Sequence, residues 1–343
     1  MNKIATLITA LAMTACTQSE LVHNDQHDRP LTFGTYVGNP AETRAGGTLV
    51  TSTTLPDGGA FGLFCYMHTD TWATLSTKPN ANFMYNQKVE VSTGTTPQTF
   101  TYTPVKYWPN NSTDKLSFLA YYPHNGTGID FEDAANTATP YTPAIANMPK
   151  AHFTVQTEAA KQVDFMYADL ETDQTKASDK VDFTFRHALT RLQFKAKRSS
   201  SSSGTGTDKV DIKITNVTVK AASKGTFDFT SQAWTADGTS TTDFTLADYT
   251  TDALTTTATD VTTAAAADKN TLLMIPQELT NVKIEVAYTQ DGDAATATLA
   301  LAGSTEPWTA NKSITYTLIL NPGNPITFTA TAGLWDDKEV ELP

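Results

Sequence analysis

Residues 282–288 read VKIEVAY, so that apolar and polar side chains alternate along the stretch. Residues 313–320 read SITYTLIL and show the same alternation. A period of two puts successive side chains on opposite faces, which is typical of a β-strand with one buried face. The chain is also rich in threonine, whose branched side chain favours extended backbone. These features predict an all-β protein.

Working outward, related patterns occur along most of the chain. In residues 212–219 the apolar positions change phase across Thr215 and Asn216, as they do at a β-bulge. No window has the period of a long amphipathic helix, and only short helical turns are expected, near 131–135 and 158–162. Further strands are expected at 60–67, 83–91, 100–107, 115–122, 163–168, 182–197, 225–230, 271–276, 295–301 and 326–332.

The length of the chain predicts more than one domain, because 343 residues exceed what one small β-sandwich needs. We place the boundary before Asp182, where the polar stretch 171–180 gives way to an alternating apolar stretch. The expected domains are therefore residues 45–181 and 182–343. A stretch rich in serine and glycine, 199–206, is compatible with a long hairpin loop or with a domain join.

The first residues have the layout of an export signal. Lys3 is followed by the apolar stretch 4–13, then by small residues and Cys16. This order predicts a lipoprotein signal peptide, residues 1–15, with Cys16 as the acylated first residue of the mature chain. The apolar stretch is too short to span a bilayer. The alternative is an ordinary signal peptide with an incidental cysteine.

Charge and cysteine content restrict the partners. The formal net charge of −12 at pH 7 disfavours nucleic acid and anionic lipid. The second of the two cysteines, Cys65, lies in an apolar stretch, where a buried thiol is the expected role. No disulfide is expected within the body of the chain.

The sequence has no motif that indicates catalysis. It lacks His-Glu-x-x-His, Gly-x-Ser-x-Gly and a phosphate-binding glycine loop. The six histidines are scattered, so we expect no bound metal and no other cofactor. Asp169, Glu171 and Asp173 alternate like the start of a calcium loop, but the glycine and closing glutamate of such a loop are missing. We therefore expect no catalytic residue and no enzyme.

One expected strand lies apart from the others, at residues 30–38 (PLTFGTYVG). It is followed by Arg44, after which two glycines make a flexible stretch of the kind that proteases need. A trypsin-like protease would cut between Arg44 and Ala45, releasing the strand. The alternative is a surface loop that is never cut.

The surrounding sequence makes Arg44 the one efficient site. Between Cys16 and Lys78 the other basic residue is Arg29. It is followed by Pro30, and a trypsin-like enzyme handles that bond poorly.

The N-terminal strand has a counterpart near the C-terminus. Residues 325–333 (PITFTATAG) share its proline, threonine, phenylalanine and final glycine. The alternate positions Leu31 and Phe33 thus match Ile326 and Phe328. Strands that present similar side chains suit the same groove in turn. The alternative is chance similarity in a threonine-rich chain.

Five short motifs together resemble those of the fimbrillin (Mfa-like, type V pilin) family of surface fimbrial subunits. Their order and spacing run from about residue 30 to the end of the chain. They are 107–109 (YWP) with 116–123 (LSFLAYYP), 185–194 (FRHALTRLQF), 308–311 (WTAN) leading to 316–318 (YTL), 326–328 (ITF), and Trp335.

The resemblance implies a fold and a pathway of maturation. Family members are exported as lipoproteins to the outer membrane and carry two tandem transthyretin-like (Greek-key) β-sandwich domains. A protease that cuts after an arginine removes their first strand, and a strand of a neighbouring subunit fills the groove to build the fimbria. The matching positions here are Cys16 for lipidation, Arg44 and Ala45 for cleavage, and Leu31, Phe33, Thr35 and Val37 for the removable strand. The counterpart strand 326–332, with Ile326, Phe328 and Ala330, is the candidate donor strand.

Three classes of function remain open from the sequence. The leading one is a structural or adhesive fimbrial subunit at the cell surface, whose partners are other subunits, the arginine-specific protease and, before maturation, the membrane. Its place in a fimbria, stalk or tip, is not fixed by the sequence, nor is a host or glycan ligand. The second is a monomeric surface lipoprotein that binds glycan through Trp72 and Trp234 in loops, whereas Trp108 and Tyr121 are expected in the core. The third is an enzyme on a β-sandwich scaffold.

Overall fold

The structure is a computed structural model, and its strands and short turns match the predicted all-β class. It describes residues 29–37, 43–45, 48–50, 54–95, 97–131, 148–199, 210–238, 240–246, 251, 253–260, 271–302, 304, 306–321 and 327–334. Within these residues the helical elements are short 3-10 turns, η1 (Trp72–Thr74), η2 (Ala159–Lys161) and η5 (Leu279–Asn281). The second falls inside the expected turn at 158–162.

The N-terminal half of the molecule is built on an eight-stranded sheet, here called the first sheet, in the order β1-β12-β10-β7-β4-β5-β6, with β11 also pairing with β7. Its central strands are buried on both faces, which explains their continuous apolar sequences. The strands are β1 (Phe33–Val37), β4 (Ala60–His68), β5 (Met84–Val91), β6 (Phe100–Thr101), β7 (Lys115–Tyr122), β10 (Met166–Ala168), β11 (Glu171–Gln174) and β12 (Val181–His187).

The C-terminal half contains two sheets. One has the order β18-β13-β22-β23, with β19 also pairing with β13, and the other has the order β17-β14-β20-β21. Their strands are β13 (Thr190–Arg198), β14 (Ile212–Ala221), β17 (Thr242–Thr245), β18 (Thr259–Asp260), β19 (Thr271–Met274), β20 (Lys283–Gln290), β21 (Asp293–Ala300), β22 (Lys312–Leu320) and β23 (Thr327–Leu334).

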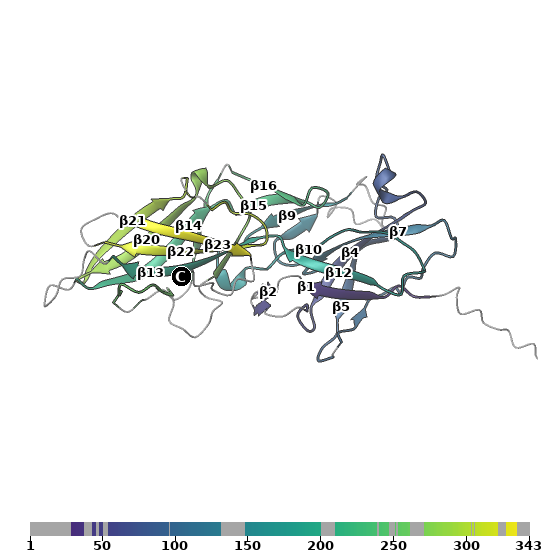
Figure 1. The fold of residues 1–343 in the computed structure, drawn as a ribbon, viewed down its shortest axis with the longest axis horizontal. Helices are drawn as coiled ribbons and strands as arrows, with labels where there is room; N and C mark the ends of the chain where they lie inside the picture. The colour runs from purple at the N-terminus through teal and green to yellow at the C-terminus, as the bar shows by residue number, and fades with distance from the viewer. Residues whose placement is uncertain are drawn as a thin grey trace, which may run out of the picture.

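A four-stranded sheet, here called the bridging sheet, joins the halves (Figure 1). It pairs β8 (Ile129–Phe131) and β9 (Lys150–Thr154) with β15 (Lys224–Asp228) and β16 (Ala233–Ala236). One buried apolar cluster runs through this region, containing Tyr121 and Phe165 of the N-terminal half with Leu192 and Phe227 of the C-terminal half. The halves therefore share a core.

The bounds of several predicted strands differ from the structure. The expected strand 182–197 is divided into β12 and β13, because the chain leaves the first sheet near Ala188 and enters another sheet. The expected strand 100–107 is reduced to β6, and Pro104 beyond it lacks a backbone donor for a ladder.

The predicted boundary before Asp182 falls inside β12. That strand pairs with β1 and β10 of the first sheet, so residues 182–187 lie with the N-terminal half. Beyond Ser199, the stretch 199–206 lies outside the described residues. The predicted bulge is present, as the register of β14 against β20 shifts between Ile214 and Asn216.

A two-stranded hairpin, β2 (Thr43–Ala45) with β3 (Thr48–Val50), follows β1 in the chain. Figure 1 shows β2 to the left of β1.

Candidate functional site

The predicted removable strand is β1, which lies at one edge of the first sheet (Figure 1). It pairs in parallel with β12, with Phe33 opposite Val181 and Val37 opposite Phe185. The pairing starts one residue earlier, since the amide of Val181 donates to the carbonyl of Thr32 at 2.9 Å. Residues 32–37 thus complete the backbone ladder of β12.

The inward side chains of this strand belong to the core. Leu31 is 2% exposed, Phe33 7% and Val37 0%. The ring of Phe33 lies 5.4 Å from Tyr102, 5.9 Å from Phe183 and 6.1 Å from Phe118, between centroids. The predicted inward position Thr35 is half-buried, and its hydroxyl is buried without a hydrogen-bond partner among the described residues.

A second edge holds the start of the strand. The amide of Leu31 donates to the carbonyl of Lys106 at 2.9 Å, and the amide of Trp108 donates to the carbonyl of Arg29 at 3.0 Å. The phenol of Tyr102 also donates to the carbonyl of Leu31, at 3.0 Å. Partial burial raises the pKa of Tyr102 from its usual value, which keeps this donor protonated.

Residues 29–37 therefore form a seam, a segment that joins two edges of one domain: β12 on one side and residues 106–108 on the other. Sequence reasoning missed the second edge. In the structure Tyr107 is exposed and Trp108 beside it is buried, as in a strand with one buried face. No local pattern in the sequence shows which segment pairs with residues 106–108.

Removal of the seam would uncover both edges. The backbone groups of β12 and of residues 106–108 would lose their partners, and apolar rings such as Phe183 would lose their cover. Unpaired strand edges beside an apolar groove bind another strand readily.

The structure describes the predicted cleavage site but not the predicted lipidation site. The bond between Arg44 and Ala45 lies in β2, and the two glycines that follow it lie outside the described residues. Cys16 and the signal peptide 1–15 lie outside the described residues.

The candidate donor strand corresponds to β23, an edge strand of the C-terminal half. It pairs antiparallel with β22 from Lys312 opposite Leu334 to Ile319 opposite Thr327. Ala330 is partly buried against the core, whereas Thr329 and Thr331 are exposed. Phe328 lies opposite Leu318 in the register, and Ile326 lies outside the described residues.

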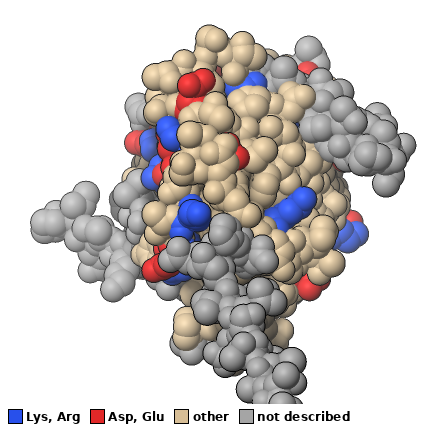
Figure 2. Space-filling model, turned by 90° about the vertical axis from the view of Figure 1, so that its right-hand side faces the viewer, with Lys and Arg blue, Asp and Glu red and all other residues tan. Residues whose placement is uncertain are grey.

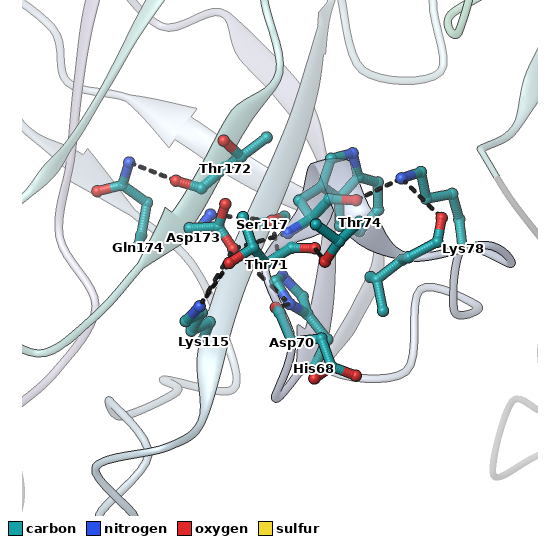
Figure 3. Close-up of polar contacts among 12 residues, drawn as sticks. His68, Asp70, Thr71, Thr74, Lys78, Lys115, Ser117, Thr172, Asp173 and Gln174 are labelled. Carbon is teal, nitrogen blue, oxygen red and sulfur yellow. Dashed lines mark hydrogen bonds and ion pairs between the residues drawn. The ribbon is translucent and has the colours of Figure 1, made fainter.

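Trp72, one of the two predicted glycan contacts, is buried at 6% exposure. Figure 3 shows the polar groups that fix its loop: Asp173 accepts from the Trp72 amide at 2.9 Å, and its own amide donates to Ser117. Ser117 in turn contacts the ring of His68 at 2.8 Å, and the Lys78 ammonium lies 4.9 Å from the Trp72 ring centroid. The Trp72 side chain is therefore part of the packed interior and is not available as a contact at the surface.

Trp234, the other predicted glycan contact, is half-buried on β16. Its indole N–H donates to the carbonyl of Ala188 at 2.6 Å. The side chain also lines a cavity of about 650 Å³ in the C-terminal half. Trp108 and Tyr121 are buried, as expected for core residues.

Other signs of chemistry are weak in the described part of the chain. No group of three or more His, Cys, Asp or Glu side chains there is arranged to hold a metal ion. None of the described helices is long and apolar enough to cross a bilayer. Figure 2 views the end formed by the N-terminal half, where lysine, arginine and acidic side chains are scattered over the visible described surface.

Solved structures of fimbrial and adhesion proteins share this fold. A fimbrial protein from Bacteroides vulgatus matches with a TM-score of 0.65 and 20% identity, over 90% of this chain and all of that one (100%). A structure described as that of a candidate cell adhesion protein from Bacteroides uniformis matches with a TM-score of 0.54 and 17% identity, over 89% of this chain and 98% of that one.

A family model described as fimbrillin-like matches residues 43–335. The chain therefore belongs to the fimbrillin-like family, as its motifs predicted. Fimbrium subunit Fim1C of Phocaeicola vulgatus is 27% identical over 239 residues, which make up 67% of this chain and 60% of that protein. The curated relative is named a fimbrium subunit, and the two solved structures are described as those of a fimbrial protein and a cell adhesion protein, names that refer to proteins of the cell surface.

Proposed function

We propose that this protein is a structural or adhesive subunit of cell-surface fimbriae that assembles by strand exchange. In this proposal it is exported as a lipoprotein acylated at Cys16 and anchored in the outer membrane. An arginine-specific protease then cuts between Arg44 and Ala45. The observation that carries the proposal is the seam, because residues 29–37 pair with two sheet edges and place three buried side chains in the core.

The groove left by the seam suits a strand with apolar side chains at alternate positions. Leu31 and Phe33 occupy it in the uncut chain, and burial of two such side chains contributes about 3–6 kcal/mol. Ile326 and Phe328 place a branched aliphatic residue and a phenylalanine at the same spacing in the candidate donor strand.

The donor would come from another subunit. Figure 1 shows β1 and β23 in opposite halves of the elongated molecule, and β23 pairs with β22 of its own chain. Leaving that edge breaks one backbone ladder but uncovers little apolar surface among its described side chains, of which Ala330 is the partly buried one. This supports a stalk position, since a stalk subunit needs a last strand that can leave.

We further propose that the halves are tandem transthyretin-like sandwiches, the first of which is completed by the seam or by its replacement. The partners are other fimbrial subunits, the same or related. No catalytic role is proposed.

The decisive experiment is N-terminal sequencing of the protein recovered from the cell surface. We expect a start at Ala45, and an Arg44→Ala variant should keep the uncut N-terminus and form no polymers. Arg29→Ala is the matched control, because it removes the other arginine of this region and should still be cut. A surface form that starts at lipidated Cys16 would contradict the proposal.

A further inference from the structure

A cavity of about 650 Å³ lies beside Trp234 in the described part of the chain. Ligand pockets in proteins commonly measure about 300–1,000 Å³. Its walls come from three places in the C-terminal half: the β16 hairpin, the turn at 276–281 and the connection 302–310. It lies apart from β1 and β12, so the seam does not account for it.

An aromatic ring is fixed in the wall of this cavity. The N–H of Trp234 is already used on the Ala188 carbonyl, and the ring packs against Phe227 at 5.3 Å and Phe165 at 6.0 Å between centroids. The side chain cannot turn without losing these contacts. A rigid indole with its polar atom occupied offers a ligand an apolar surface, which suits the C–H face of a sugar ring.

The remaining lining is polar but almost uncharged. In a chain with 60 charged side chains, the one ionisable residue of the lining is Glu278. Glu278 and Asn281 are exposed, and their side chains have no partner among the described residues. Ser240, Thr241 and Thr309 add hydroxyl groups. A carboxylate and an amide with free hydrogen-bonding capacity suit the adjacent hydroxyls of a sugar.

A second hollow, of about 360 Å³, continues from the first and shares Gly238, Thr241 and Asn281 with it. It is lined by two lysines. Lys220 is paired with Asp243 at 3.0 Å and lies 3.7 Å from Glu285, whereas Lys283 is exposed. The extension therefore adds length, and its exposed cation lies outside the lining of the cavity that holds Trp234.

We infer that this groove binds an oligosaccharide through an uncharged sugar, whose ring lies against Trp234 and whose hydroxyls bind Glu278 and Asn281. The inference rests on the adhesive part of the proposed function and gives that role a ligand class. It is measured on the monomeric chain, so its failure is distinct from failure of strand exchange, which is measured by polymer formation.

The test is isothermal titration calorimetry of the unprocessed chain with lactose, mannotriose and N,N′,N″-triacetylchitotriose, which are all uncharged. We expect saturable binding of at least one of them, weakened at least tenfold in the double variant Glu278→Gln, Asn281→Ala. The matched control is Glu90→Gln with Asn110→Ala, two exposed positions of the N-terminal half, which should bind as the parent does.

Trp234→Phe provides a second variant that keeps an aromatic ring, and its binding should fall while its melting temperature shows that the fold is kept. A charged sugar, 3′-sialyllactose, and the hexapeptide ITFTAT (residues 326–331) complete the panel. The inference would be overturned if none of the three neutral sugars bound, or if binding were unchanged in the double variant. It would also be overturned if the hexapeptide bound and none of the sugars did.

Discussion

The ring of Phe33 on β1 lies 5.9 Å from the ring of Phe183 on β12, between centroids, so the segment expected to leave the chain packs directly on the strand that would lose it. The two strands are parallel neighbours in the first sheet. A segment with this contact is part of the core in the chain that the structure describes.

The first prediction concerns the contribution of Phe33 to the uncut chain. Phe33→Ala should lower the free energy of unfolding by about 3–5 kcal/mol, because a buried ring is replaced by a cavity. Urea unfolding of the uncut protein measures this loss. Tyr36→Ala is the control on the same strand, since that ring is 50% exposed, and its effect should be much smaller. Equal effects of the two substitutions would contradict the burial of Phe33.

The second prediction concerns the close approach of β4 and β7. A Cβ atom at Gly62 would overlap the ring of Tyr121, which is fully buried and donates to Asn86 at 2.6 Å. Gly62→Ala should therefore lower the free energy of unfolding by about 1–3 kcal/mol or more. Gly238→Ala is the matched control, as no atom lies within 4 Å of the added Cβ there. A neutral Gly62→Ala would show that the ring of Tyr121 can move.

The third prediction concerns pH and the phenol that holds the seam. Tyr102→Phe removes the donor to the Leu31 carbonyl and should lower the free energy of unfolding by about 1 kcal/mol at pH 8. The folded pKa of Tyr102 is raised, so its contribution is complete below the unfolded value, about 10, and is lost as pH rises through the folded value.

The stability difference between the parent and Tyr102→Phe should accordingly narrow above about pH 10, as urea unfolding at a series of pH values would show. Other buried tyrosines titrate in both proteins, so the difference between the two curves isolates Tyr102. Tyr107→Phe is the control, because that ring is 47% exposed. Its free energy of unfolding should equal that of the parent at every pH. A gap that widens at high pH would contradict the direction of the pKa shift.

The fourth prediction concerns the candidate donor strand. Phe328→Asp should block polymer growth while leaving the monomer folded, because a charged group would have to enter the apolar groove in place of Phe33. Polymer length by electron microscopy and monomer folding by circular dichroism are the two measurements. Thr329→Asp, at an exposed neighbouring position, should polymerise as the parent does. Normal polymers from Phe328→Asp would exclude this strand as the donor.

Sequence patterns predicted the strands whose burial produces a regular pattern of apolar residues. The alternation in residues 282–288 and 313–320 corresponds to β20 and β22, and the phase change at Thr215 corresponds to the bulge against β20. Strand β7 has no alternation because both of its faces are buried. It was predicted from its continuous run of apolar and aromatic residues instead.

Sheet membership could not be read in the same way. The strand at 182–187 has the strongest pattern in its region, but nothing local shows that it pairs with β1 and β10 and not with β13, the next strand in the chain. For the same reason the pairing of Leu31 with Lys106 was not predicted, since the partners are far apart in sequence.

Burial of single residues in loops was equally hard to predict. Trp72 follows a polar stretch and would be expected at the surface, but Asp173, distant in the sequence, accepts its backbone amide and draws the turn onto the sheet. Trp234 also lies among small and polar residues in the sequence, but its side chain is only half-buried and lines a cavity. The difference between the two lies in tertiary contacts.

The bridging sheet has a mechanical consequence for a chain of subunits under flow. β9 and β15 form a backbone ladder of five residue pairs between the halves, from Lys224 opposite Thr154 to Asp228 opposite Lys150. Tension applied to the two ends of one subunit would therefore load a hydrogen-bonded sheet and a common core, and no extensible linker. Such a subunit stretches little before it unfolds, so a fimbria built from it would transmit force from a bound surface to the cell with its length nearly unchanged.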